Sequence, residues 1–355
     1  MMRTAVLAAL GLLAACASGP PTGPAQRYAN PVLDTDFPDP AVLKASDGYF
    51  YAYATQGEHD SRMRNIQVAR SSDLVRWNHL GDALPAKPVW AAKTQDFWAP
   101  HVAEHGGRYY LYYSAKPDAA LDDKSLGLCL AVATAERPEG PFTDIGEPLQ
   151  CGEGFVNIDP MAYDDPRTGK RLLYWGSGFG PIKVQELAPD RISFTPGSRP
   201  IDLLAVDKTD DPANYQRLIE GAWVHYRAPY YYLFYSGDNC CGPNAHYAAM
   251  VARSRSATGP FETLEQATGA KSSVVLERGG TWTAPGHNSV ATDDAGRDWL
   301  VYHAVDTRRP RTKPTDDVNS RRIMLIDPIR WENGWPRIDG PSESVRPAPA
   351  ARRRR

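Results

Sequence analysis

The sequence has almost no net charge and no helical periodicity of useful length. Its 355 residues include 40 Lys and Arg against 42 Asp and Glu, a formal net charge of −2. A nucleic-acid-binding protein would carry an excess of positive charge, so we expect no nucleic acid partner. The lack of a sustained 3.6-residue apolar pattern argues against a helical fold.

The apolar run at the N-terminus is too short to span a bilayer as a permanent helix. Residues 1–16 have the features of an export signal, with one arginine, a short apolar stretch and small residues before Cys16. The ending Leu13-Ala-Ala-Cys16 resembles a bacterial lipoprotein box, in which the cysteine is lipidated and becomes the mature N-terminus. An ordinary secretory signal with an incidental cysteine is the alternative. We expect an exported bacterial protein anchored to envelope lipid through Cys16, and Ala17 favours the outer membrane.

Two segments without core-forming residues flank the rest of the chain. Residues 17–27 are rich in Pro, Gly and Ser and predict a disordered tether. Residues 343–355 end in four arginines and predict a solvated tail. We expect residues 28–342 to form one domain and the protein to be a monomer.

Cysteine is scarce, and an even number remains after the signal. Cys129 and Cys151 could bridge two strands and their exit loop. Cys240 and Cys241 are adjacent and would not easily bond each other without backbone strain. The pairing stays open at the level of the sequence.

A short run of aromatic and aliphatic residues recurs five times. The last residues of successive runs are 59, 63, 59 and 68 residues apart. Tyr, Phe, Trp and Val suit a pleated strand, and each run is followed by turn residues and a second strand-like stretch. The runs are Tyr51–Thr55, Tyr110–Ser114, Leu173–Ser177, Tyr232–Ser236 and Leu300–Ala304.

Repeats of this length are typical of propellers, solenoids and arrays. About sixty residues with three or four antiparallel strands match one propeller blade. The sequence therefore predicts an all-β fold, a five-bladed β-propeller. A β-sandwich also has many short strands, but it does not explain fivefold internal similarity.

Ionisable and aromatic residues lie 16 to 18 positions before the end of each run. They are Asp39, Trp98, Asp159, Glu220 and His287. Each is expected at the start of the innermost strand of its blade, where strands line the central channel. The pattern predicts an active site at the mouth of that channel.

The three carboxylates among these residues suit glycoside hydrolysis, in which one acid protonates the leaving oxygen and another carboxylate activates water or attacks the sugar. Glu220 has apolar neighbours and is our candidate for the acid, while Asp39, held between two prolines, suits the base. Asp159 would position the acid and keep its pKa high. A single Asp-Pro pair more often marks a turn or strand start, so the argument rests on all three acids.

At these residues the chain resembles glycoside hydrolase family 43, over essentially residues 28 to 340. The matching stretches include Asn30–Pro40, Ile158-Asp-Pro160, Ile219-Glu-Gly221 and Pro285–Asn288. The resemblance implies a five-bladed propeller and an inverting hydrolase of arabinose- or xylose-containing polysaccharides. It also assigns the general base to Asp39, the general acid to Glu220 and the pKa-tuning role to Asp159.

The resemblance implies further site residues. His287 matches a family histidine that supports a central ion, often calcium, through waters; no cofactor is required for the reaction itself. A histidine that hydrogen-bonds inside the channel is the alternative, since calcium prefers oxygen. Arg322 resembles a substrate-contacting arginine, and Phe37 and Trp98 are candidates for stacking on a sugar ring. A salt-bridged blade arginine is the alternative for Arg322, and ordinary blade packing is the alternative for Phe37 and Trp98.

Resemblance to particular members of the family narrows the expected substrate class. Asp238-Asn-Cys-Cys-Gly242 resembles the loop of arabinan-degrading members, whereas Pro243–Tyr247 departs from the endo-acting pattern. We expect cleavage of α-L-arabinofuranosyl linkages in arabinan or arabinose-decorated plant cell-wall polysaccharide, with exo or endo action open. A β-xylosidase acting on xylo-oligosaccharides and a catalytically silent glycan-binding propeller are the alternatives.

Overall fold

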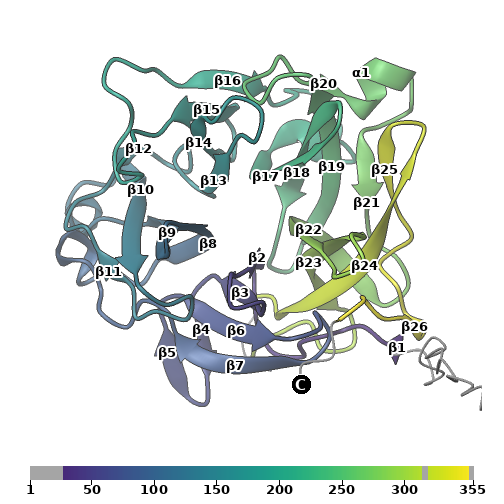
Figure 1. Cartoon of the computed structure of the whole chain (residues 1–355), viewed down its shortest axis with the longest axis horizontal. Coiled ribbons are helices and arrows are strands. Elements are labelled where there is room, and N and C mark those ends of the chain that lie inside the picture. The colour runs from purple at the N-terminus through teal and green to yellow at the C-terminus, as the bar shows by residue number, and fades with distance from the viewer. Residues whose placement is uncertain (1–26, 314–318, 352–355) are drawn as a thin grey trace, which may run out of the picture.

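Each of the five aromatic runs forms the second strand of an antiparallel sheet. The computed structural model describes residues 27–313 and 319–351. Five sheets of four or five strands stand around a central axis, with their first strands innermost (Figure 1). The five-bladed β-propeller predicted from the repeat is confirmed, and a two-sheet sandwich is excluded.

The blades follow one another along the chain. The first blade contains β2 (Ala41–Lys44), β3 (Phe50–Ala54), β6 (Gln67–Ser71) and β7 (Trp77–Asp82). The second contains β8 (Phe97–His105), β9 (Arg108–Ala115), β10 (Leu126–Ala135), β11 (Thr143–Asp144) and β12 (Gln150–Glu153). The third contains β13 (Met161–Asp164), β14 (Arg171–Trp175), β15 (Ile182–Glu186) and β16 (Ile201–Leu204). The fourth contains β17 (Ile219–Arg227), β18 (Tyr230–Asn239), β19 (His246–Ser254), β20 (Glu262–Thr263) and β21 (Val274–Leu276). The fifth contains β22 (Trp282–Thr292), β23 (Asp298–Asp306), β24 (Arg322–Glu332) and β25 (Trp335–Ile338).

Few elements lie outside the blades. Two small sheets pair β1 (Arg27–Tyr28) with β26 (Arg346–Pro347) and β4 (Gly57–His59) with β5 (Arg62–Arg64). The helices of the described part are short: η1 (Val89–Ala91), η2 (Asp118–Leu121), η3 (Tyr215–Arg217) and α1 (Leu264–Thr268). None of these helices is long and apolar enough to cross a membrane.

The core consists of five apolar clusters, one between each pair of neighbouring blades. Side chains alternate along a strand, so one strand supplies both faces of its blade. Tyr113 of β9 packs toward the first blade, while its neighbour Tyr112 packs toward the third. This packing fixes the blades around the channel.

The N-terminal segment joins the first blade to the fifth. Asn30 exchanges hydrogen bonds with Ile326 of β24, at 2.9 and 3.0 Å. The backbone N–H of Phe37 donates to the carbonyl of Arg322 at 2.7 Å. Asp39, which follows, is thereby placed against the fifth blade.

Several predictions concern the ends of the chain. Residues 1–16, with the proposed lipid anchor at Cys16, and residues 17–26 of the tether lie outside the described residues, as do residues 352–355. The part of the expected tail that is described differs from the prediction, because Arg346–Pro347 form a strand with Arg27–Tyr28. Ordered backbone therefore continues beyond residue 342.

Both cysteine pairs are bonded. Cys129 of β10 and Cys151 of β12 are partners in the ladder and form one disulfide. The neighbours Cys240 and Cys241 form the other. The pairing that the sequence left open is therefore Cys129 with Cys151 and Cys240 with Cys241.

Candidate active site

An equivalent residue in or just before each innermost strand has a left-handed backbone. These residues are Asp39 (φ 57°), Ala99 (φ 45°), Asp159 (φ 58°), Gly221 (φ 64°) and His287 (φ 46°). Such angles are uncommon outside glycine, and their fivefold recurrence marks one shared turn toward the channel. The strand ladders of β8, β17 and β22 shift register at this point. Trp98 and Glu220 therefore sit one residue before the equivalent position, which the sequence pattern had not resolved.

A hydrogen bond from the neighbouring blade holds four of these turns. The backbone N–H of Asp159 donates to Ser114 Oγ at 3.0 Å, and that of His287 donates to Ser236 Oγ at 2.8 Å. Thr55 accepts in the same way from the N–H of Ala99. Between the last blade and the first, His303 Nδ1 replaces the hydroxyl and accepts from the N–H of Asp39 at 3.1 Å. The blades thus position one another's channel residues.

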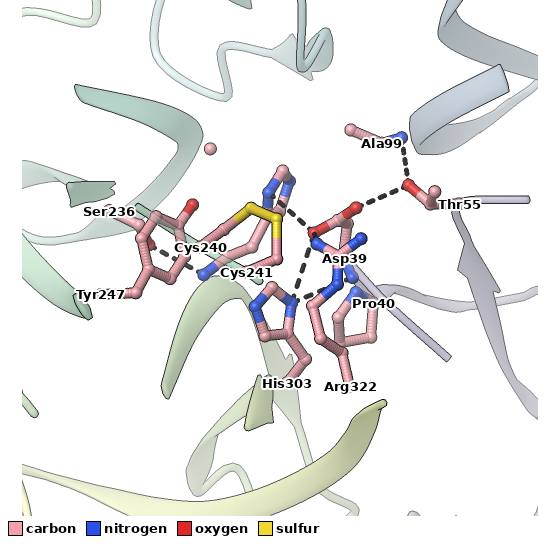
Figure 2. A network of polar contacts seen from close by, with 12 residues as sticks. Asp39, Pro40, Thr55, Ala99, Ser236, Cys240, Cys241, Tyr247, His303 and Arg322 are labelled. Carbon is pink, nitrogen blue, oxygen red and sulfur yellow. Dashed lines mark hydrogen bonds and ion pairs between the residues drawn. A yellow bond between two sulfur atoms is a disulfide. The ribbon is translucent and has the colours of Figure 1, made fainter. Parts of the chain in front are cut away.

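The carboxylate of Asp39 is surrounded by polar side chains, as Figure 2 shows. Arg322 Nη1 donates to Oδ1 at 2.9 Å, and Thr55 Oγ1 donates to Oδ2 at 2.6 Å. The Nδ1 atoms of His287 and His303 each lie 3.3 Å from Oδ1. Burial is the largest influence and raises the pKa of Asp39, but Arg322 and the two histidines together bring it well below the usual value. Asp39 is therefore ionised at neutral pH.

The pKa values of Glu220 and Asp159 are shifted in the opposite direction, upward. Burial, with a smaller contribution from Asp39, raises the pKa of Glu220 to about 7, although the hydrogen bond from the Tyr247 hydroxyl at 2.8 Å to Oε1 opposes this. Burial and then the negative charge of Glu220 raise the pKa of Asp159 well above its usual value. Oxygens of both carboxyls lie within 4.8 Å of each other and of a ring nitrogen of His287. At neutral pH this pair of carboxyls therefore holds a proton.

These groups share one pocket of about 280 Å³. The structure brings together all the site residues predicted from the sequence except Phe37; the pocket is lined by Asp39, Asp159, Glu220, His287, Arg322 and Trp98. Phe37 has no exposed surface and packs in the cluster between the fifth and first blades. The prediction that Phe37 stacks on a sugar ring is therefore wrong, because a fully buried ring has no face that a sugar could contact.

Sequence reasoning missed several residues of the site. Thr55 and His303 lie within the repeated runs, and the hydroxyl residue that ends four of the five runs was a usable signal for Thr55. Tyr247 belongs to the segment that departs from the endo-acting pattern, but its contact with Glu220 crosses from β19 to β17. Phe155 and Phe179 also line the pocket and carried no signal, because they lie in irregular loops.

Few protein ligands for calcium surround His287, where the resemblance implies a central ion. His287 and Asn288 line a small channel cavity of about 20 Å³, and neither polar atom of the buried Asn288 amide has a partner. A cavity of this size holds about one water molecule. Calcium takes six to eight oxygen ligands, so water would have to provide most of them. Asp159, Glu220 and His287 nevertheless form a group whose ligand atoms could hold a metal ion, and no step of the proposed reaction passes through it.

The geometry can be compared with known proteins. The model of the family described as "Glycosyl hydrolases family 43" matches residues 28–336. A probable arabinan endo-1,5-alpha-L-arabinosidase A of Aspergillus flavus is 30% identical, over 88% of this chain and 94% of that protein. An extracellular exo-alpha-(1->5)-L-arabinofuranosidase of Cellvibrio japonicus is 27% identical, over 86% of each chain. A thermostable family-43 glycoside hydrolase of known structure is 27% identical with a TM-score of 0.72, over 92% of this chain and all of that one.

Proposed function

The chain belongs to glycosyl hydrolase family 43, and from this premise we propose that it is an inverting glycosidase of α-L-arabinofuranosyl linkages in arabinan or arabinose-decorated plant polysaccharide. One observation carries the proposal: a single pocket holds a carboxylate with a lowered pKa, Asp39, and a carboxyl with a raised one, Glu220. Acid and base roles require carboxyl groups whose environments separate their pKa values in this way.

In the proposed reaction Glu220 donates its proton to the glycosidic oxygen as the bond from that oxygen to C1 breaks. A water molecule attacks C1 from the opposite face and gives its proton to Asp39. The contacts of Asp39 with Thr55 and Arg322 hold the base in place, since both of its oxygens are engaged. Asp159 accepts a hydrogen bond from the backbone N–H of Gly221 at 2.9 Å, which fixes it beside the acid, and we assign to it the positioning of Glu220.

The substrate class is supported by the names of the relatives, which describe both endo- and exo-acting enzymes on 1,5-linked arabinan. A β-xylosidase remains the second candidate within the family. A silent binding propeller would be expected to have lost at least one of the three acids, and all three are present in the pocket.

Product analysis tests the proposed activity. The full chain is incubated with linear 1,5-arabinan and, separately, with xylo-oligosaccharides. Arabinose or short arabino-oligosaccharides are expected, and their lengths distinguish exo from endo action. Xylose alone would move the assignment to β-xylosidase, and no product from either substrate would favour the binding propeller.

Two variants test the assignment of roles. Glu220→Gln should lower kcat/KM on 1,5-arabinan by about 10²–10⁴-fold, because no proton reaches the leaving oxygen. The loss should be much smaller on an aryl arabinofuranoside whose leaving group needs no proton. Asp39→Asn should be inactive on both substrates, because water activation is needed in each case. Equal losses on both substrates for Glu220→Gln would contradict the acid assignment.

We further propose that the protein is exported and tethered to membrane lipid through Cys16. The lipoprotein-like ending of residues 13–16 supports this, and two relatives are named as extracellular. Metabolic labelling with a radioactive fatty acid should mark the wild-type chain and not Cys16→Ser. Equal labelling of both chains would reject the anchor.

A further inference from the structure

The pocket has a nonpolar wall to which the proposed proton transfers assign no role. Besides Trp98, this wall includes Phe155, Phe179 and the disulfide of Cys240 and Cys241. Phe155 is 46% exposed and Phe179 is 72% exposed, although large aromatic side chains are normally covered. Exposed apolar surface that gathers at the rim of a pocket is characteristic of a binding site.

The aromatic part of this wall presents flat surfaces to the pocket. The rings of Trp98 and Phe155 are stacked, with centroids 6.0 Å apart and planes at 16°. Phe179 lies in the loop after β14, next to Gly178, and lines the same pocket. Such rings bind the C–H face of a sugar while the hydroxyl groups remain free for polar partners.

The loop that carries the disulfide is fixed at several points. Asp238 accepts from His246 Nδ1 at 2.7 Å and pairs with Arg217 at 3.1 Å. The backbone N–H of Gly242 donates to Ser320 Oγ at 2.8 Å, which ties the loop to the fifth blade. The disulfide is therefore a preformed surface, and its sulfur atoms are polarizable and apolar.

The position of the disulfide relative to Glu220 indicates which part of a substrate it meets. Glu220 of β17 pairs with Ser236 of β18, and β18 runs on directly into the Cys240–Cys241 loop. The acid must approach the leaving group, so neighbouring surface on the same blade faces the leaving-group side. Cys241 and Trp98 also line an adjoining groove, into which a longer chain can continue.

We propose that the Cys240–Cys241 disulfide, with the exposed rings of Phe155 and Phe179, forms a nonpolar subsite for the sugar residue on the leaving-group side of the scissile bond. This inference rests on the proposed function. A 1,5-linked arabinofuranosyl residue presents ring C–H groups and the methylene of its linkage, which match a surface made of rings and sulfur.

A comparison of two substrates tests the subsite. Linear arabino-oligosaccharides place a sugar there, whereas α-L-arabinofuranosyl fluoride has only fluoride as its leaving group. The double variant Cys240→Ala/Cys241→Ala should lose about 10–100-fold in kcat/KM on the oligosaccharides, chiefly through KM, and nothing on the fluoride. Phe179→Ala, which alters an exposed residue and leaves the core intact, should show the same selective loss.

The matched control alters an exposed apolar residue that does not line the pocket. Ile201→Ala, at a 48% exposed position of β16, should keep wild-type kinetics on both substrates. If Phe179→Ala and the Cys240/Cys241 variant keep wild-type kinetics on oligosaccharides, or lose activity equally on both substrates, the subsite is rejected. If the Cys240/Cys241 variant does not fold, Phe179→Ala alone decides. A wild-type chain that hydrolyses neither substrate would instead reject the proposed function, and the subsite with it.

Discussion

At the scale of single residues, three buried carboxyl groups lie in one channel, and their neighbours decide which is charged. Asp39 has Arg322 within hydrogen-bonding distance, and its pKa falls despite burial. Glu220 has only the neutral hydroxyl of Tyr247 as a partner, so burial raises its pKa to about 7. Asp39 is therefore charged at neutral pH, whereas Glu220 loses its proton as the pH rises through about 7.

The pH dependence of kcat/KM should follow from these values, because it reports the groups of the free enzyme. Activity requires ionised Asp39 and protonated Glu220, so it should fall as pH rises through about 7. Tyr247→Phe should move this alkaline limb to higher pH, since the lost hydrogen bond stabilises the charged form of Glu220. A pH–rate profile on arabino-oligosaccharides measures the shift.

A second tyrosine provides the control for this shift. The Tyr174 hydroxyl donates to the backbone carbonyl of Ala257, outside the pocket. Tyr174→Phe should leave the alkaline limb at its wild-type position. An unchanged limb in Tyr247→Phe, or a shift to lower pH, would show that Glu220 is not the group that titrates.

At the scale of elements, the working unit is the turn at the start of each innermost strand together with its acceptor on the preceding blade. Ser114 and Ser236 accept from the N–H groups of Asp159 and His287. Ser177 occupies the same place in the third blade, but its buried hydroxyl has no hydrogen-bond partner. Ser177 is therefore a control for Ser114 and Ser236, because it has the same place in the repeat and its hydroxyl makes no hydrogen bond.

Ser114→Ala should cost about 1–3 kcal/mol of unfolding free energy, because the buried N–H of Asp159 is left without an acceptor. Ser177→Ala should cost less, since no hydrogen bond is lost. Urea denaturation of both variants gives the comparison. A loss for Ser177→Ala as large as that for Ser114→Ala would mean that the hydroxyls matter for packing and not as acceptors.

The elements also show what the sequence could and could not predict. The spacing of the aromatic runs was enough to place the strands, and counting 16 to 18 residues back from the end of each run found Asp39 and Asp159. The offset of one residue at Trp98 and Glu220 depends on backbone angles that no residue type reports. Tyr247 and the Cys240–Cys241 bond were missed because contacts between strands and the course of a loop decide them.

At the scale of the whole molecule, the ring of blades is joined by the N-terminal segment along β24. Asn30 makes hydrogen bonds to Ile326 and to Ser342, all between 2.9 and 3.0 Å. The same segment leads into Asp39, so the joint between the blades and the position of the base are linked.

Asn30→Ala should therefore lower the free energy of unfolding by about 1–3 kcal/mol, because it leaves partly buried polar groups of the fifth blade unpaired. Asn78→Ala, at an exposed position of β7, should have little effect. Urea unfolding of the two variants measures the difference. Equal stability of both would mean that the segment contributes little to joining the first and fifth blades.

The most direct test of the account follows the first sugar released from linear 1,5-arabinan by proton NMR. Hydrolysis by water activated at Asp39 and acid at Glu220 should release new reducing ends as the β-anomer, because attack comes from the face opposite the broken bond. The α-anomer would then grow by mutarotation. Release of the α-anomer first would contradict the single-displacement mechanism and the assignment of Asp39 as a base.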